Sequence, residues 1–236
     1  NRSVRWTGRV RVMRRVFALF AALTFAVTMT GCSKSGASDK PVSERLAAAA
    51  SNLASTSGVR ADVHTEDLPK GVNGLISAKG IGTKAPAFQG DIQIVTDGLS
   101  AGSPIIAVDG KVYINLGSWK TINVSDFGAP DPALLFGTAG GLAGLFSQVS
   151  DAKADKDVRR GDKIYSTITG TIPGDSVHAL VPGAANEPFQ ATFLLDESDV
   201  VSRMVITGPF YPKAGTDNTY TIDLSEYGTT ATIAKP

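Results

Sequence analysis

One serine of this chain has the spacing of a hydrolytic nucleophile. Gly98-Leu99-Ser100-Ala101-Gly102 matches the G-x-S-x-G pattern, in which serine lies on a strained turn between a strand and a helix. Here the apolar residues 104–108 follow, which predict another strand, so we interpret the motif as a hairpin loop. The only histidine after Ser100 is His178, between two prolines, where a helix end or the surface is the expected position. The motif therefore gives little support for a serine hydrolase.

Metal and phosphate chemistry is no better supported. His64 and Glu66 share one face of a predicted strand with Asp62, but no second histidine or cysteine lies near them, so we expect a solvated sheet face. Residues 79–84 lack the spacing of a phosphate loop. The mixed charges of residues 151–162 lack the spacing of a calcium loop and predict a solvated edge. The acids Asp196, Glu197 and Asp199 are expected to form an exposed turn. No catalytic residue, metal or cofactor is predicted.

The single cysteine has a more specific context. Cys32 follows Thr30-Gly31 at the end of an apolar run, residues 16–27, which the basic Met13-Arg14-Arg15 precedes. This pattern is typical of a secretory signal, and the run is short for a membrane-spanning helix of about 20 residues. A small residue, glycine and then cysteine is similar to a bacterial lipobox, in which the thiol is diacylated. We therefore predict lipidation at Cys32, with an ordinary secretory cleavage site as the alternative.

These features divide the chain into three parts. Met13 is the expected start of translation, and residues 1–31 comprise upstream sequence and a lipoprotein signal peptide. Residues 32–40 are small and polar and predict a flexible spacer behind the lipidated cysteine. Residues 41–236 are expected to form a single domain.

The charge balance excludes one large class of partner. Six arginines lie among residues 1–15, which leaves 17 basic residues against 22 acidic ones in the rest of the chain. Nucleic-acid binding requires a clustered positive face, so this mildly acidic remainder disfavours it. We expect a globular protein that is a monomer and does not bind nucleic acid.

Hydrophobic periodicity predicts an α+β domain. Residues 41–54 have the spacing of an amphipathic helix with a small, Ala-rich apolar stripe. Residues 131–149 have helical spacing interrupted by glycines, which predicts two short helices or one kinked helix, and Asp131-Pro132 supplies its start. Alternating segments predict an antiparallel meander, because the connections are too short for crossover helices. These strands are expected at 59–66, 72–81, 88–95, 104–108, 111–116, 119–124, 152–158, 163–172, 189–196, 200–207 and 218–225.

The core composition leaves two possibilities open. Aromatic residues make up only 7% of the chain, and the predicted helices are rich in alanine and glycine. A wide sheet under such helices could enclose a dry apolar cavity suited to an acyl chain. On residue statistics alone, an ordinary, tightly packed α+β core is the favoured alternative.

Several short segments follow one another in a distinctive order along residues 32–236. They are the Cys32 motif with its polar spacer and Ala-rich helix, FQGDIQI at 88–94, VDGKVYINLG at 108–117, the Asp131-Pro132 helix start, GLAGLF at 141–146 leading to DAKA at 151–154, ITGTIP at 168–173 and DLSEYG at 223–228. In this order they resemble one known family, the mycobacterial LppX/LprA/LprF/LprG lipoproteins. Two departures are Tyr227, where the family usually has tryptophan, and a longer loop at 208–216.

The resemblance implies both a fold and a function. The fold would be a strongly curved antiparallel β half-barrel with short helices on its concave face, enclosing an apolar cavity. The function would be that of a non-enzymatic carrier, attached by its lipid anchor to the outer face of the plasma membrane. It would bind acylated envelope lipids, triacylglycerol or a glycolipid or lipoglycan, and move them across the periplasm with a membrane exporter.

Strand alternation and helical spacing then predict which side chains line this cavity. Ile92 and Ile94 share one face of their strand. Val112, Ile114 and Leu116 likewise share one face of the following hairpin. The predicted lining is Ile92, Ile94, Val112, Ile114, Leu116, Leu134, Leu135, Leu142, Leu145, Phe146, Phe193, Leu195 and Met204. The alternatives are an interaction lipoprotein that binds a protein partner or regulates an envelope transporter, with a filled core and an exposed apolar patch, and an envelope hydrolase that depends on Ser100.

Overall fold

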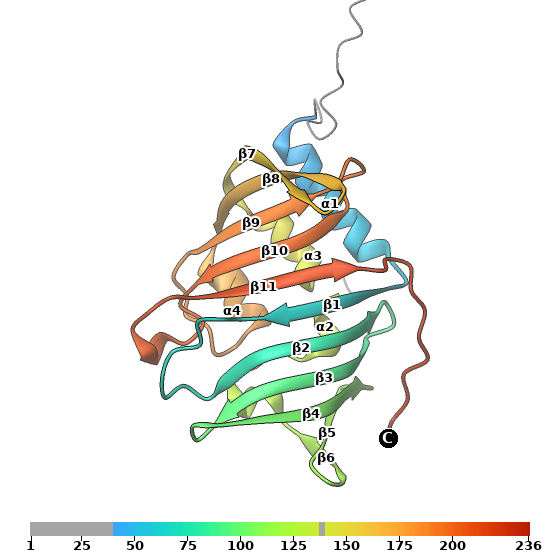
Figure 1. Cartoon of the computed structure of the whole chain (residues 1–236), viewed down its shortest axis with the longest axis vertical. Coiled ribbons are helices and arrows are strands. Elements are labelled where there is room, and N and C mark those ends of the chain that lie inside the picture. Colours follow the sequence, from blue (N-terminus) through green and yellow to red (C-terminus); the bar gives the residue numbers. More distant parts are fainter. Residues whose placement is uncertain (1–39, 137–139) are drawn as a thin grey trace, which may run out of the picture. The chain divides into compact units, whose positions relative to one another are not determined.

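The computed structural model describes residues 40–136 and 140–236. These residues form one antiparallel sheet of eleven strands in the order β6-β5-β4-β3-β2-β1-β11-β10-β9-β8-β7. The strands are β1 (Gly58–His64), β2 (Gly74–Thr83), β3 (Ala87–Thr96), β4 (Leu99–Val108), β5 (Lys111–Asn115), β6 (Trp119–Ile122), β7 (Ser150–Arg160), β8 (Lys163–Ile172), β9 (Phe189–Leu195), β10 (Val201–Gly208) and β11 (Asn218–Ser225). Figure 1 shows the sheet as a curved, unclosed layer. The predicted meander is confirmed.

The sheet consists of two meanders joined in its middle. β1 to β6 follow one another on one side, and β7 to β11 follow one another on the other. β1 pairs with β11 from Arg60 opposite Ser225 to His64 opposite Thr221. This pairing joins residues far apart in sequence, so local patterning could not predict it.

Two-residue turns connect the tightest hairpins. Asp109 and Gly110 both have positive φ, 53° and 67°, as a type I′ turn requires, and an Asp-Gly pair between two strands favours such a two-residue hairpin. Asp97 and Gly98 adopt the same conformation, with φ of 51° and 77°. β4 therefore begins directly at Leu99, so Ser100 lies inside this strand and not in the hairpin loop predicted for residues 98–102. The turn is shorter than predicted because Asp97 and Gly98 alone reverse the chain.

The helices cover one face of the sheet (Figure 1). They are α1 (Val42–Ser55), η1 (Val124–Phe127), α2 (Pro132–Phe136), α3 (Leu142–Leu145), η2 (Phe146–Gln148) and α4 (Gly174–Leu180), with η3 (Pro212–Ala214) in the loop before β11. α2 packs on β2, β3 and β4, whereas α1 packs on α3, η2 and β7. The Asp131 Oδ1 atom accepts the Ala133 N–H at 2.9 Å, which confirms the predicted helix start.

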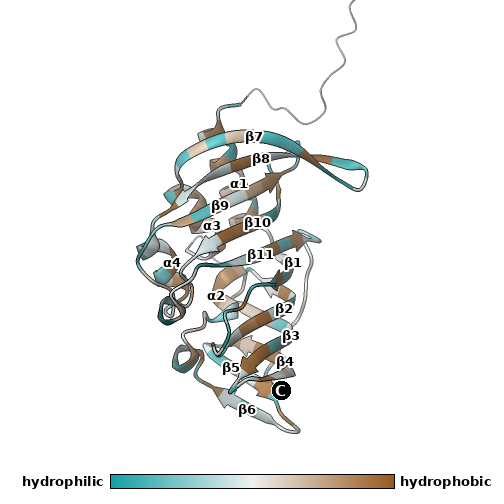
Figure 2. Ribbon diagram, turned by 60° about the vertical axis from the view of Figure 1, so that its left-hand side comes forward, coloured by the Kyte–Doolittle hydropathy of each residue, from teal (hydrophilic) through white to brown (hydrophobic). Residues whose placement is uncertain are grey.

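Aromatic pairs fill the β8–β10 half of this covered face. The rings of Phe146 and Phe193 lie 4.8 Å apart, and Phe189 packs edge-on against Phe210 at the same distance. Phe193, Leu195 and Met204 are completely buried. Figure 2 shows hydrophobic and hydrophilic residues alternating along many strands, as expected of a sheet with one wet face. The side chains beneath β8 and β9 therefore belong to a buried core.

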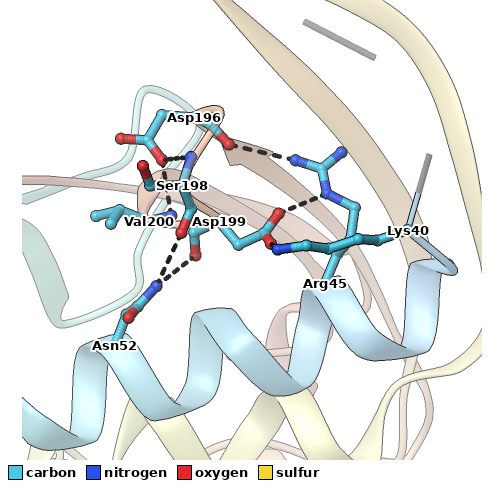
Figure 3. A network of polar contacts seen from close by, with 7 residues as sticks. All are labelled: Lys40, Arg45, Asn52, Asp196, Ser198, Asp199 and Val200. Atoms are coloured by element: carbon cyan, nitrogen blue, oxygen red, sulfur yellow. Dashed lines mark hydrogen bonds and ion pairs between the residues drawn. The ribbon is translucent and has the colours of Figure 1, made fainter. Parts of the chain in front are cut away.

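A buried ion pair attaches α1 to the β9–β10 turn (Figure 3). Asp199 is fully buried, and its Oδ1 accepts a 2.6 Å hydrogen bond from Nε of Arg45, which is 5% exposed. Lys40 Nζ donates to Oδ2 of the same carboxylate at 2.9 Å. Asn52 Nδ2 donates to the backbone oxygens of Ser198 and Asp199. Burial opposes ionisation of Asp199, but the hydrogen bonds from Lys40 and Arg45 outweigh it and hold the pKa of this carboxyl below its usual range.

This network corrects the prediction of an exposed acidic turn at residues 196–199. Glu197 is exposed as expected, but Asp199 points inward with a positive φ of 59°. Asp196 Oδ1 accepts the N–H groups of Ser198 and Val200, which holds the turn in this shape. The cations that pair with Asp199 come from more than 150 positions earlier in the chain, so sequence spacing could not reveal them.

Charged side chains cover the other predicted wet regions. β7 is exposed along most of its length and forms an edge of the sheet, as predicted for residues 151–162. Asp223 accepts two hydrogen bonds from Arg203, at 2.7 and 2.6 Å, and pairs with Arg160. Although burial raises the pKa of Asp223, the hydrogen bonds and charges of these arginines lower it below its usual range. The charged side chains of β7 disfavour non-native strand pairing along this edge.

Candidate functional site

A cavity of about 420 Å³ lies between the helices and part of the covered sheet face. Its lining comes from β1–β6, β10 and β11 on one side and from η1, α2, α3, α4 and their connecting loops on the other. Among the described residues, β7, β8 and β9 contribute none of the lining. The lining residues are Val63, Asn73, Gly74, Leu75, Ala78, Phe88, Ile92, Ile94, Val95, Thr96, Ile105, Ile114, Ile122, Val124, Asp126, Phe127, Gly128, Ala129, Pro130, Pro132, Leu135, Phe136, Leu142, Leu145, Val177, Leu180, Val181, Gly183, Ile206, Phe210, Tyr211, Tyr220 and Ile222.

Strand alternation produces the apolar wall. Ile92 and Ile94 point toward the cavity from β3, and Gln93 between them is exposed on the opposite face. Ile105 of β4 lies opposite Ile114 of β5, so both side chains extend from the same sheet face. The wall is therefore built from branched aliphatic side chains that present no hydrogen-bonding group to a ligand.

A glycine allows α2 to approach the sheet closely. A Cβ atom on Gly82 of β2 would lie 2.5 Å from Cδ2 of Phe136 and 2.6 Å from its Cβ, so only glycine fits without displacing this side chain. The Phe136 ring stacks on Phe88 of β3, with ring centroids 5.9 Å apart. Both rings line the cavity and close its β2–β3 side.

Two tyrosines form a polar point in this apolar lining. Tyr220 donates its O–H to the Leu75 carbonyl at 2.7 Å, and its oxygen lies 2.8 Å from that of Tyr211. Tyr211 in turn accepts the Leu75 N–H at 3.2 Å. The two tyrosine hydroxyls and the Leu75 backbone thus provide hydrogen-bond partners for one another. They lie where the pairing of β2 with β3 shifts register, between Leu75 and Ser77. Burial and the neighbouring Tyr211 raise the pKa of Tyr220 above its usual value, so its hydroxyl stays protonated and donates.

Exposed and half-buried lining residues mark the mouth of the cavity. Asn73 precedes β2, Thr96 ends β3, and Asp126 and Phe127 belong to η1. Phe127 is 58% exposed although it also lines the cavity. Of the described lining residues, Asp126 is the single acid, and none is lysine, arginine or histidine. The mouth is thus polar and weakly acidic, and the interior is apolar.

Six of the thirteen predicted lining residues lie in this lining: Ile92, Ile94, Ile114, Leu135, Leu142 and Leu145. Two others are exposed, Leu116 at 58% and Leu134 at 51%. β5 ends at Asn115, so its alternation does not extend to Leu116, and α2 turns Leu135 and Phe136 toward the sheet and Leu134 away from it.

The other five predicted residues are buried in the core outside the cavity lining. They are Val112, Phe146, Phe193, Leu195 and Met204. Phe146 fills the space that the prediction left empty, because its ring packs directly against Phe193. Orientation toward the covered face was correct for these residues, but which part of that face is filled depends on packing between distant elements.

Sequence reasoning also missed much of the lining. Ile206, Tyr220 and Ile222 lie on β10 and β11 at alternating positions, so the period that identified Ile92 and Ile94 could have found them. Phe127, Leu180 and Tyr211 lie at helix ends or in loops, where no local periodicity marks an inward side chain. Their approach depends on how the loops cross the sheet.

The candidate catalytic groups are dispersed. Ser100 is exposed on β4, and its Oγ accepts a hydrogen bond from Gln93. His178 lies in the last turn of α4, with Nδ1 2.7 Å from the Ala184 carbonyl oxygen. His64 pairs with Asp62 on the outer face of β1, and Lys79 binds the same carboxylate. Within residues 40–136 and 140–236, no group of three or more His, Cys, Asp or Glu side chains could hold a metal ion.

No helix within the described residues is long and apolar enough to cross a membrane. Cys32, the predicted signal peptide of residues 1–31 and the spacer up to residue 39 lie outside the described part of the chain.

Comparisons with known proteins agree with this architecture. The model of the LppX_LprAFG lipoprotein family matches residues 42–233. The lipoarabinomannan carrier protein LprG of Mycobacteroides abscessus is 26% identical over 228 residues, which cover 93% of this chain and 96% of the relative. The protein of the same name from Mycolicibacterium smegmatis is 29% identical and covers 94% of this chain and 96% of its own.

Solved structures show the same fold. The crystal structure of LprF from Mycobacterium bovis superposes with a TM-score of 0.69 at 16% identity, covering 83% of this chain and 96% of its own. LppX from Mycobacterium tuberculosis gives a TM-score of 0.62 at 20% identity, covering 84% of this chain and all of its own. With the family match across residues 42–233, this chain belongs to the LppX_LprAFG lipoprotein family.

Proposed function

We propose that this protein binds the acyl part of an envelope lipid in the cavity and carries it across the cell envelope without chemical change. The apolar cavity under α2 and α3 is the observation that carries this proposal. Buried apolar surface contributes about 25 cal/mol per Å², so the lining holds hydrocarbon without any directional contact. Membership of a family that includes two proteins named as lipoarabinomannan carriers supports a glycolipid or lipoglycan ligand.

Attachment to the membrane belongs to the same proposal. Acylation of Cys32 would tether the domain to the outer face of the plasma membrane, because multiple acyl chains anchor stably at about 0.8 kcal/mol per buried methylene. The proposed partner of the tethered carrier is a membrane exporter that loads or accepts the lipid. The competing role, a partner-binding lipoprotein without cargo, requires a filled core, and the cavity argues against it.

Mass spectrometry tests the proposal directly. Native spectra of the whole chain from an actinobacterial host are expected to show added mass that denaturing conditions remove, whereas an anchor on Cys32 stays covalently attached. Ile92→Trp puts an indole into the cavity and is expected to abolish the removable mass. Gln93→Trp makes the same kind of change on the outer face of β3 and is expected to retain it. A removable lipid in both variants would refute the cavity as its binding site. Absence of removable lipid from the wild type and from both variants would refute lipid binding itself.

A further inference from the structure

We infer that the rim of the cavity mouth docks on a lipid bilayer through two exposed apolar side chains, Leu99 and Phe127. The contact is apolar and reversible, and it places the mouth directly on the membrane surface. This inference rests on the proposed function and adds the surface through which a membrane lipid reaches the cavity. The position of the two side chains, their continuity with the cavity lining and the charge of the mouth lead to it.

The exposed large apolar side chains are concentrated on elements around the cavity. Over residues 40–136 and 140–236 they are Leu99, Leu116, Trp119, Phe127, Leu134 and Val158. The first five lie on β4, the β5–β6 hairpin, η1 and α2, all of which contribute to the lining. Val158 lies apart from them on β7, at the opposite edge of the sheet from β6. Exposed apolar side chains gathered beside one opening are typical of an interaction surface.

Leu99 lies on the strand side of the mouth. It is 74% exposed and pairs across β3 and β4 with Thr96, a half-buried lining residue at the mouth. Leu99 and Ile105 are six positions apart on β4, so both side chains extend from the cavity face. The Asp97 N–H donates to Oδ1 of Asn73 at 2.8 Å, which joins the β3–β4 turn to the start of β2 (Figure 1). The rim therefore holds Leu99 in place beside the opening.

Phe127 lies on the helix side of the same mouth. Its side chain is 58% exposed and also lines the cavity, so apolar surface continues from the interior to the outside. At the start of η1 the Asn123 Oδ1 atom accepts the Ser125 N–H, and Gly128, with a φ of 64°, ends this helix. The Gly183 N–H donates to the Gly128 carbonyl at 2.9 Å and fixes the turn against the loop after α4. An exposed phenyl ring is thus held at the opening by backbone contacts.

The charge of the mouth favours a bilayer over an electrostatic partner. No described lining residue is lysine, arginine or histidine, so the mouth offers no positive charge to an acidic protein or to anionic head groups. Leu99 and Phe127 can instead enter the boundary between head groups and acyl chains, where apolar burial needs no specific partner atom. The polar side chains beside them then stay at the level of the head groups. An acyl chain passes from bilayer to cavity along apolar surface without crossing water.

Two side chains make a weak contact. Full burial of a leucine or phenylalanine side chain favours the apolar environment by at least about tenfold. Two of them bind less strongly than one myristoyl chain, whose own attachment is already marginal and reversible. A carrier has to leave the membrane again after loading, so weak binding suits it. A tether on Cys32 would keep the domain close enough to bind again.

Sedimentation with sucrose-loaded vesicles tests the contact. Residues 40–236 are used, because they contain the whole family match and the continuous core from Leu46 to Leu224, and they omit Cys32, so that no anchor contributes. The solved LppX chain, which corresponds over its full length to 84% of this one, folds as such a domain by itself. Circular dichroism verifies the sheet of every variant before use.

We expect this domain to bind vesicles of dioleoylphosphatidylcholine with a partition coefficient that salt does not change. Leu99→Ser and Phe127→Ser should each lower the coefficient by about tenfold, and the double variant by about a hundredfold. Val158→Ser, which removes an exposed apolar side chain from the opposite edge, should leave it unchanged. Adding dioleoylphosphatidylglycerol should not strengthen the binding, because the mouth has no basic lining residue.

The inference is overturned if the wild type ignores vesicles, if the double variant partitions as the wild type does, or if binding requires anionic lipid. Uptake of total envelope lipid from detergent micelles, recorded by native mass spectrometry, tests the proposed function separately. Leu99 does not line the cavity, so Leu99→Ser should take up lipid from micelles as the wild type does. A wild type that takes up this lipid but ignores vesicles would overturn the docking rim alone. A wild type that takes up none would refute the proposed function itself.

Discussion

Replacing Asp199 by asparagine tests how α1 is held on the sheet. Asp199 has a positive φ of 59°, a conformation that asparagine also tolerates, so the substitution removes charge without adding backbone strain. It leaves Arg45, which is 5% exposed, with its positive charge and only the Asp196 carbonyl at 3.3 Å as a further partner within the network. The perturbation is therefore an uncompensated buried cation rather than a lost surface contact.

The magnitude follows from this burial. Removing one member of a buried ion pair costs about 3–5 kcal/mol, and the retained amide oxygen still accepts one hydrogen bond from Arg45, so we expect a loss of about 3 kcal/mol. For a domain of this size, with a urea m-value of about 3 kcal/mol/M, the unfolding midpoint should fall by about 1 M. Lys40, whose side chain is 55% exposed, contributes less, and Lys40→Met should cost at most about 1 kcal/mol.

Urea unfolding followed by circular dichroism measures these changes. Glu197→Gln is the matched control, because it neutralises an exposed acid of the same turn and should change stability by no more than about 0.5 kcal/mol. Combining Asp199→Asn with Arg45→Met should cost less than the sum of the single changes, since the double variant leaves no buried charge unpaired. A loss below about 1 kcal/mol for Asp199→Asn, or simple additivity with Arg45→Met, would refute this account of the network.

Three further predictions concern acid, packing and the tyrosine pair. Because the folded-state pKa values of Asp199 and Asp223 lie below the unfolded value of about 4, their stabilisation is complete above that pH and is lost as pH falls through the folded values. Urea midpoints should thus drop below pH 4, and less steeply in Asp199→Asn. Gly82→Ala should displace Phe136, cost about 1–3 kcal/mol and weaken lipid binding in native mass spectra, whereas Gly102→Ala, with 3.7 Å of clearance, should keep full lipid occupancy. Tyr220→Phe should lower the melting temperature by an amount equivalent to about 1–2 kcal/mol, and an unchanged value would show that its hydrogen bonds contribute nothing net.

Patterns within a few residues were enough to predict most of the secondary structure. Residues 163–172 and 218–225 form strands with the predicted limits, and the Asp109-Gly110 turn and the Asp131 helix start are present. Each of these features depends on backbone preferences or on alternation between a wet and a dry face, which neighbouring residues determine. The fold family was also accessible from sequence, through the order of weakly matching segments.

The position of the cavity was not accessible in the same way. Alternation predicted inward side chains for Ile92, Ile94 and Ile114, which line the cavity. It predicted the same for Phe193, Leu195 and Met204, which are buried in the core instead. Periodicity reports which face of a strand is dry, but it carries no information on whether the space beyond that face is empty or filled.

The sequence by itself thus determined the elements, the dry face of the sheet and the family. Tertiary structure decided that Phe146 and Phe193 fill one half of this face, that the β1–β11 pairing joins the two meanders, and that Asp199 meets Arg45 in the interior. Local preferences act over a few residues, whereas packing density and buried charge pairing arise only when distant segments come into contact. The ligand space is what remains between those segments, so it is a property of the assembled fold.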